Sequence, residues 1–565
     1  MAEQKRENGL LARGQSVVRD ILLAIFSNEA LFLMVAFFYA TLSDNSIAAW
    51  YREPVNLLYN FIVVPWGAAL CLLRLQRRSA SLEPTRADVA TLFVLYLWLL
   101  APFAIRFGFT FKNVSAWYSY AVMFFGVYAS ISEKKRRERE TLLATMSVLS
   151  AVFTYVFCGV LLFCAWNGTA YAADLGAFGF GVVRGWLCAG VHYNITGMIV
   201  ISLCMMCVMG VGYHKNVLLK LFCLIPAVMA MLVIVLSQSR TSRYALLAAL
   251  AVAAFDGVYR ASVRRKGLTR VLAAGIAALV VLGGGYWGAN RLTQAAVAHY
   301  NQLAYDAALA AAQAEAEAAR QAAETEAAQQ AEAAQQAEIE AAQQAEAAQQ
   351  AETEAAQQTE QAEPDIAETP EAQQAAQTAP STEQPQAAPK VQQTEQPTET
   401  PAIAETPAPE IKINEVEVRE LFNQDGSFGA RTDIWRAVFQ TWRDNPKMML
   451  IGNGANQTGS KIGQYISWAD SVAVHNAYLQ WAADFGVIGL ALHMIFLIFA
   501  VWQTIRVFFA PKRPRGALGL CMMVITGLIV GLMESAPLMA MLPINLMFMF
   551  ALAQLSAMSR ETAEK

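Results

Sequence analysis

Residues 217–238 read VLLKLFCLIPAVMAMLVIVLSQ, a nearly uninterrupted apolar run with one lysine near its start. A helix of about twenty such residues crosses the roughly 30 Å hydrocarbon core of a bilayer, because each residue adds about 1.5 Å. The chain repeats this pattern in about twelve blocks. Only 15 % of its 565 residues are charged, whereas an average soluble domain has about a quarter. The sequence therefore predicts a polytopic membrane protein.

We expect an all-α bundle of about 12 transmembrane helices, with helices 1–9 in residues 1–288 and helices 10–12 in residues 476–565. A large loop separates the two groups. It contains a low-complexity insert over residues 289–410 and a helical cap over residues 411–475. The predicted spans cover approximately residues 20–42, 55–73, 88–107, 114–131, 141–165, 191–213, 217–238, 241–259, 268–288, 484–506, 516–535 and 538–558.

Lysine and arginine are concentrated in every second connection between the predicted spans. Residues 134–139, 260–270 and 506–515 are examples. Short loops rich in these residues tend to remain cytoplasmic. The pattern predicts an inner-membrane protein with both termini in the cytoplasm and the large loop in the periplasm.

The insert has two compositions. Its first part repeats the unit Ala-Glu-Ala-Ala-Gln-Gln irregularly, as in residues 329–350, and lacks an apolar stripe. Alanine, glutamate and glutamine favour helix, so we expect a solvated, partly helical rod. From Pro364 onward, proline, threonine and glutamine dominate, and this tract cannot form a core. We interpret the insert as a spacer; the alternative is that it reaches peptidoglycan or a partner.

The cap contains an amphipathic helix followed by breaker residues. The 3.6-residue period places one apolar group on a single face: Ile434, Trp435, Val438, Phe439 and Trp442. Asn445-Pro446 is expected to end this helix, and Gly452-Asn-Gly454 predicts a turn. The cap should pack on the membrane bundle or lie in the interface.

Two arginines stand at an outer membrane boundary, in the short connection that contains Ser239, Arg240 and Arg243. Arginine on this side opposes the charge bias of insertion. Such a side chain either extends to lipid headgroups or binds a buried anion. A guanidinium group remains charged and can hold two phosphate oxygens at once.

Histidine is rare in the chain, and His475 has the most suggestive position. It lies where the cap re-enters the membrane, at the start of an amphipathic helix, and a neutral imidazole can accept a hydroxyl proton. His192, beside Asn194 in the first turn of a span, is a weaker candidate for an outward cavity. We expect His214, His299 and His493 to be structural or solvated. The eight cysteines have no metal-site spacing and suit apolar packing.

These motifs resemble the O-antigen ligase/polymerase superfamily. The resemblance rests on Ser239-Arg240 after an apolar span, on Arg431 to Trp435 followed by the breakers, and on the block from His475 to Gly489. That superfamily includes lipid A-core ligases, Wzy-type polymerases and protein O-oligosaccharyltransferases, and it is similar to membrane glycosyltransferases of the GT-C type. Asp484 stands where the family pattern more often has glutamate.

The resemblance implies a glycan transferase with an undecaprenyl-diphosphate-linked donor and an active site facing the periplasm. His475 would activate the acceptor hydroxyl, and the donor diphosphate would bind to Arg240 and Arg431, with Arg243 able to share either role. A direct displacement inverts the anomeric centre and requires no cofactor or metal, because arginines replace the cation. The supporting residues would be Ser239, Asn476, Tyr478, Asp484, Trp435, His192 and Asn194.

The acceptor separates three related reactions. A ligase uses lipid A-core, a polymerase uses another lipid-linked repeat, and an oligosaccharyltransferase uses a protein serine. We favour the ligase, with lipid A-core and membrane lipid as partners and no nucleic acid. A lipid or glycan transporter is the alternative from another class, but it predicts ionisable groups near the bilayer midplane and internal repeats. The acids Glu29, Asp256 and Glu534 lie instead near span ends or an interruption, and no repeat is visible.

Overall fold

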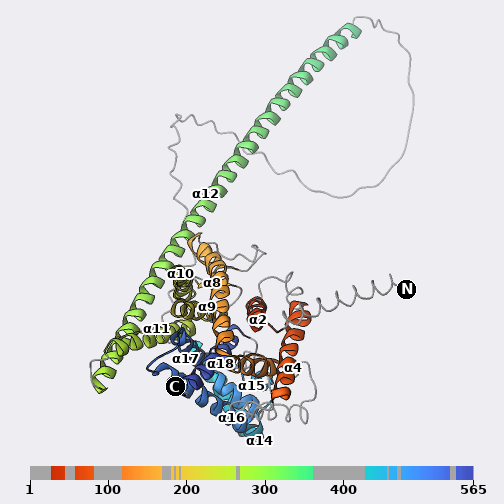
Figure 1. The fold of residues 1–565 in the computed structure, drawn as a ribbon. Helices are drawn as coiled ribbons and strands as arrows, with labels where there is room; N and C mark the ends of the chain where they lie inside the picture. Colours follow the sequence, from red (N-terminus) through yellow and green to blue (C-terminus); the bar gives the residue numbers. More distant parts are fainter. Residues whose placement is uncertain are drawn as a thin grey trace, which may run out of the picture. The chain divides into compact units, whose positions relative to one another are not determined.

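The protein is described by a computed structural model (Figure 1). Its chain divides into two compact units, one formed by Met1–Leu303 with Glu415–Lys565 and the other by Ala304–Asn414. The structure describes residues 27–44, 57–81, 118–167, 180–183, 186–189, 193–262, 267–359, 427–454, 457–466, 472–534 and 542–563.

The described part of the chain is predominantly helical, and 6 of its helices are long and apolar enough to cross a membrane. This confirms the expectation of a helical polytopic membrane protein. The complete set of about twelve spans remains a prediction, since the block at 88–107 lies outside the described residues. The six helices are α8 (Arg136–Asn167), α9 (Tyr193–Tyr213), α10 (Val217–Leu236), α11 (Arg240–Ala261), α12 (Gly267–Thr359) and α16 (Ala477–Phe508).

Further apolar helices complete the bundle. The segment before α8 contains two π-helical stretches, which are usually short. These remaining elements are α2 (Glu29–Asp44), η1 (Tyr59–Val63), α4 (Val64–Ser81), η3 (Val122–Ala129), α7 (Ser130–Ser132), α17 (Ala517–Met533) and α18 (Pro543–Ala563).

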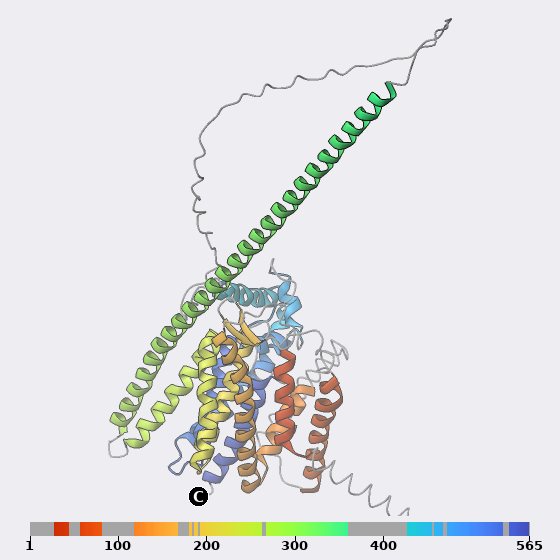
Figure 2. The same cartoon turned by 90° about the horizontal axis from the view of Figure 1, so that it is seen from above.

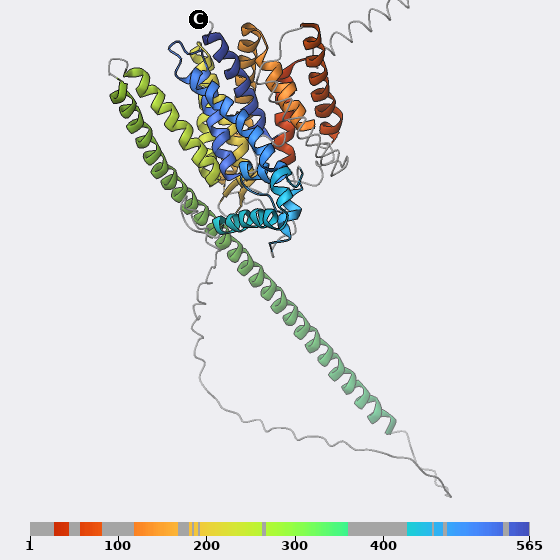
Figure 3. The same ribbon diagram turned by 90° about the horizontal axis from the view of Figure 1, so that it is seen from below.

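Helix α9 lies at the centre of the bundle and packs against α8, α10, α11 and α17. Small residues allow its closest contacts, as is common between membrane helices. A Cβ atom on Gly519 of α17 would lie 2.4 Å from the Cα of Met209, and one on Gly210 would lie 2.7 Å from the sulfur of Cys223. Figures 2 and 3 show α8 to α11 and α16 to α18 running side by side.

A short β-hairpin departs from the all-α expectation. Strands β1 (Phe180–Val183) and β2 (Trp186–Ala189) pair antiparallel, with Phe180 opposite Ala189 and Val183 opposite Trp186. Valine and tryptophan favour strands. The hairpin contacts α8, α9 and α10, so it adds a small β element to the helical bundle.

The cap consists of α13 (Ser427–Asp444), α14 (Pro446–Ile451) and α15 (Thr458–Gly463). Its apolar cluster joins Val438 of α13 and Ile462 of α15 to Ala483 of α16. As predicted, α13 ends before Asn445-Pro446. Phe439 was expected on the packed face but is 56 % exposed. Figure 2 shows α13, in cyan, lying across one end of the bundle.

Two glycines allow the backbone of the cap to contact the backbone of α16 directly. Gly452 has a φ of 78° and Gly486 has a φ of 70°, a region that disfavours side chains. A Cβ on Gly452 would lie 2.1 Å from the carbonyl oxygen of Asp484. Backbone N–H groups of Asn453 and Gly454 donate to the carbonyls of Ala483 and Asp484, both at 2.8 Å. At the kink around Gly486, the carbonyls of Ala483 and Asp484 in α16 accept hydrogen bonds from the predicted Gly-Asn-Gly turn.

The second unit contains the later part of α12, which continues as helix through the Ala/Glu/Gln repeats. Every side chain from residue 313 to residue 351 is exposed. This agrees with the expected solvated helical rod, because these residues favour helix and present no apolar face. The Pro-rich tract after Pro364 lies outside the described residues, so its predicted disorder remains untested.

Candidate functional site

Several helix ends converge beneath the cap. Helices α9, α11 and α16 begin at this end of the bundle, and α17 ends there. Hydrogen bonds among residues at these termini establish their proximity: Ser239 donates to Asn194 at 3.1 Å, and Asn476 donates to the carbonyl of Leu532 at 3.1 Å. Segments that are hundreds of residues apart in sequence thus form one site.

Glu534, immediately after α17, is the centre of this site. Its Oε1 accepts hydrogen bonds from the Asn194 amide at 3.1 Å and the Thr241 hydroxyl at 3.3 Å. The same oxygen pairs with the Arg431 guanidinium at 3.1 Å. Oε2 lies 3.1 Å from Nδ1 of His475. Glu534 is only 6 % exposed, so these polar partners compensate for burying its charge.

The Glu534 contact determines the role of each His475 nitrogen. An ionised carboxylate only accepts hydrogen bonds, so Nδ1 of a neutral imidazole carries the proton and donates. Nε2 then has the acceptor lone pair. The side chain is 34 % exposed, and its backbone φ of 52° is uncommon for a residue other than glycine. The position of His475 before α16 thus turns a ring with a defined acceptor nitrogen toward the site.

Helix caps position the polar groups around Glu534. Ser239 caps α11 by accepting from the N–H of Ser242, and Asn476 caps α16 by accepting from Leu479 at 2.9 Å. Close contact between α9 and α11 requires Gly197, since a Cβ there would lie 2.7 Å from the Cβ of Ser239. The N-termini of helices carry partial positive charge. Three of them around a buried carboxylate make the site suitable for anions.

The two arginines of the outer connection have different surroundings. Arg240 is the first residue of α11, is partly exposed and precedes Thr241, which contacts Glu534. Arg243 is 1 % exposed, and its guanidinium donates to the carbonyl of Val235 and to the Thr293 hydroxyl, the latter at 2.7 Å. Arg243 thereby joins α10, α11 and α12, and its predicted share in donor binding remains a prediction.

The other predicted supporting residues hold the cap and α16 in place. Trp435 donates to the carbonyl of Val474 at 2.9 Å, directly before His475. The Tyr478 hydroxyl donates to the carbonyl of Leu528 at 2.9 Å, fixing α16 against α17. Asp484 is 1 % exposed and accepts from Thr458 of the cap and from Gln480. These contacts support the site without adding a reactive group.

The other described histidines are either packed within the bundle or exposed. His493 is buried and stacks on Trp481 with a centroid distance of 4.3 Å. His214 lies 2.8 Å from the Ser147 hydroxyl, and burial lowers its pKa. His299 is exposed. His192 lies outside the described residues, so its predicted place at an outward cavity is untested. Within the described part of the chain, no group of three or more metal-ligating side chains occurs.

Sequence reasoning missed the role of Glu534. The residue was noticed only as an acid near a span end, whereas the structure makes it the common partner of Asn194, Thr241, Arg431 and His475. One signal was available: a carboxylate beside an apolar helix must find cationic or hydrogen-bonding partners. The predicted residues His475, Arg431 and Asn194 meet at this carboxylate, and Ser239 reaches it through Asn194.

Comparison with known families gives a match to part of the chain. Residues 406–494 match the family model described as O-Antigen ligase. The matched segment includes α13 to α15 and the first part of α16, and therefore Arg431 and His475. It supports the resemblance to the O-antigen ligase/polymerase superfamily. No curated protein matches the chain.

Proposed function

We propose that this chain, whose residues 406–494 match the O-Antigen ligase family model, transfers a glycan from an undecaprenyl-diphosphate carrier to a sugar hydroxyl of lipid A-core. The observation that supports this most strongly is the convergence of His475 and Arg431 on Glu534. An imidazole with an acceptor nitrogen lies beside a guanidinium and three helix N-termini. This combination suits an acceptor hydroxyl and an anionic leaving group.

In the proposed reaction, the acceptor oxygen attacks the anomeric carbon of the donor sugar while the bond to the diphosphate oxygen breaks. Nε2 of His475 takes the hydroxyl proton. The diphosphate keeps the electron pair and leaves on its lipid carrier, and the single displacement inverts the anomeric centre. Glu534 stabilises the imidazolium that forms, as a buried acid does for a catalytic histidine.

Arg240 and Arg431 are proposed to bind the diphosphate. A guanidinium group can bind two phosphate oxygens and remains charged in a partly buried site. Arg431 already has a fixed orientation because one nitrogen pairs with Glu534 at 3.1 Å. The N-terminus of α11, which begins at Arg240, adds partial positive charge. These groups supply positive charge that a divalent cation provides in other phosphate chemistry.

The site is proposed to face the periplasm. The opposite end of the bundle carries the basic connections, including residues 134–139 and 506–515. Such connections remain in the cytoplasm of bacterial inner-membrane proteins. Lipid-linked glycans and lipid A-core would then meet beneath the cap. We retain the GT-C-like bundle of about twelve spans as part of this proposal.

The test is reconstitution of the full chain in liposomes with undecaprenyl-diphosphate-linked glycan and purified lipid A-core, with and without a chelator. We expect a higher-mass product on a glycan gel in both cases. His475→Ala should reduce its rate at least about 100-fold, because general base catalysis contributes roughly that much or more. His299→Ala, which removes an exposed histidine, is the control.

Absence of product with intact donor and acceptor would refute the ligase assignment. Product formation with a lipid-linked repeat or a serine peptide as acceptor, but not with lipid A-core, would indicate the polymerase or the oligosaccharyltransferase. A normal rate of product formation by His475→Ala would refute the proposed role of His475 as the base.

A further inference from the structure

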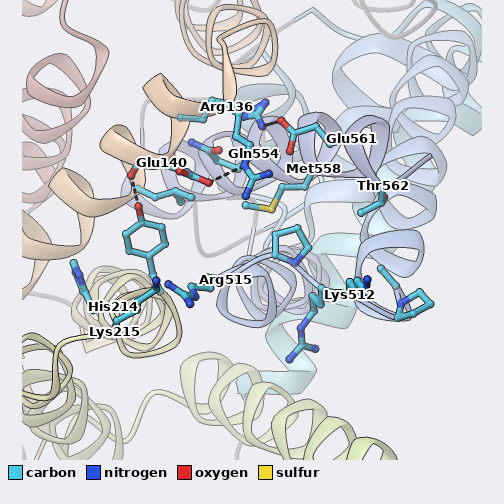
Figure 4. A pocket seen from close by; sticks show the side chains of 17 residues that line it. Arg136, Glu140, His214, Lys215, Lys512, Arg515, Gln554, Met558, Glu561 and Thr562 are labelled. Atoms are coloured by element: carbon cyan, nitrogen blue, oxygen red, sulfur yellow. Dashed lines mark hydrogen bonds and ion pairs between the residues drawn. The ribbon is translucent and has the colours of Figure 1, made fainter. Parts of the chain in front are cut away.

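A pocket lies at the opposite end of the bundle from Glu534. It has a volume of about 970 Å³ and is formed by the start of α8, the end of α9, the connection between α16 and α17, and the last turns of α18 (Figure 4). We call it the basic pocket. The 21-residue helix α9 connects the two ends, and at about 1.5 Å per residue it separates them by roughly 30 Å. The basic pocket is therefore distinct from the proposed active site.

The walls of the basic pocket carry an excess of positive charge. Some of its cations have acidic partners: Arg136 pairs with Glu140 at 2.8 Å, and Arg139 pairs with Glu561. Arg513 pairs with Asp256 at 2.7 Å. Three further cations of the pocket have no ion pair with any residue that the structure describes. These are Lys215, Lys512 and Arg515, and all three are exposed. The pocket thus has positive charge available for an anion.

Gln554 provides an independent indication of a ligand. Its side chain lines the basic pocket and is 0 % exposed. Both its amide nitrogen and its amide oxygen lack a hydrogen-bond partner among the described residues. Buried amides in folded proteins nearly always have partners. A ligand that both accepts and donates hydrogen bonds would satisfy this group.

Part of the remaining wall is apolar. Leu143, Met558 and Pro514 line the same space, and α8 and α9 are long and apolar enough to cross a membrane. Basic pockets between membrane helices on the cytoplasmic side suit anionic lipid headgroups. A soluble anion would use the cations but not the apolar walls, whereas a phospholipid uses both.

We propose that the basic pocket binds the headgroup of an anionic membrane phospholipid. Its phosphate contacts Lys215, Lys512 and Arg515, and the polar part of its headgroup reaches the Gln554 amide. The acyl chains extend along the apolar helix surfaces into the bilayer. The site is a lipid-binding site on the face opposite to glycan transfer, and it does not depend on the proposed reaction.

The experiment is native mass spectrometry of the purified full chain in detergent, titrated with dioctanoyl phosphatidylglycerol. Dioctanoyl phosphatidylcholine and inorganic phosphate are parallel probes. A triple variant, K215Q/K512Q/R515Q, removes the available cations. Its matched control, K135Q/R137Q/R506Q, removes the same charge from exposed positions that do not line the pocket.

We expect the wild type and the control variant to bind phosphatidylglycerol alike and to bind phosphatidylcholine more weakly. The pocket variant should bind phosphatidylglycerol at least about tenfold more weakly, because each basic residue contributes to anionic-lipid binding. Gln554→Leu should also weaken binding while leaving thermal stability equal or higher, since it removes a buried amide without a partner.

Three results would overturn the proposal. Equal weakening in both triple variants would show that only the total surface charge matters. Inorganic phosphate that displaces phosphatidylglycerol at similar concentration would identify a site for free anions. Unchanged lipid binding by both the pocket variant and Gln554→Leu would show that the lipid binds elsewhere.

Discussion

Replacement of Glu534 by glutamine tests the central contact of the proposed active site. The two side chains have nearly the same shape, but glutamine lacks the charge and has one accepting atom instead of two. In the wild type, Oε1 serves Asn194, Thr241 and Arg431, while Oε2 serves His475. The amide oxygen should remain with the three donors, which places the amide nitrogen opposite the imidazole.

The substitution should reverse the tautomer of His475. An amide nitrogen donates, so Nδ1 of His475 must become the acceptor and the proton moves to Nε2. The proposed base is then lost even though the side chain remains in place. A serine protease in which the corresponding aspartate is changed to asparagine loses about 10⁴-fold in kcat for the same reason.

The magnitude can be bounded from the contacts. Glu534 is 6 % exposed and has two cationic or ionisable partners, Arg431 and His475, each at 3.1 Å. Charge-assisted hydrogen bonds contribute about 1.5–3 kcal/mol each. Glutamine removes the charge from both contacts and reverses the imidazole, so transfer should fall at least about 100-fold, which is roughly what a general base contributes.

The assay is the liposome reaction with lipid-linked glycan, read as initial rate and accompanied by a thermal unfolding measurement. Asp256→Asn is the matched control. Asp256 is also buried and paired with Arg513 at 2.7 Å, but this pair lies at the other end of α11. The control should lose stability and keep its transfer rate per folded molecule. A Glu534→Gln protein with a rate near that of the wild type would refute the role given to this carboxylate.

Three further predictions concern other parts of the chain. Arg431→Lys should lower transfer at least about tenfold, because an ammonium cannot replace a planar fork, whereas Arg436→Lys at an exposed position should not; equal rates would contradict diphosphate binding. Gly197→Ala should destabilise the protein by about 1–3 kcal/mol, because the added Cβ forces α9 away from α11. Gly257→Ala is the control and should leave stability unchanged, since a Cβ there meets nothing within 4 Å. Unchanged thermal unfolding of both variants would contradict the close contact. Deletion of residues 310–405 should leave most transfer activity, and its loss in an inserted, folded protein would show that the insert is more than a spacer.

Local sequence patterns predicted much of the helical framework. Apolar runs such as residues 217–238 form helices because length and composition suffice for a membrane span. Asn445-Pro446 ends α13, and Gly452-Asn-Gly454 forms a turn, because proline and glycine restrict or free their own backbone. The contact of this turn with α16 is a separate, tertiary feature. His475 was also recognised as a helix-entry residue.

Long-range pairing could not be predicted in this way. Glu534 meets Asn194 across 340 positions and Arg431 across 103, and no local period encodes such contacts. The kink at Gly486 falls inside a helix that begins before the predicted span at 484–506. Phe439 follows the helical period of its apolar neighbours but is exposed, because the cap contacts only part of that face.

The charge arrangement explains how a buried carboxylate can belong to a site for an anionic donor. Glu534 directs one oxygen to three donors and the other to His475, so its charge is compensated before any substrate binds. In the proposed reaction, a diphosphate that competes for Arg431 would weaken one of these contacts. The carboxylate would then depend more on the imidazole, and a stronger hydrogen bond to Nδ1 makes Nε2 a better proton acceptor. Donor binding would thereby activate the base that the acceptor requires.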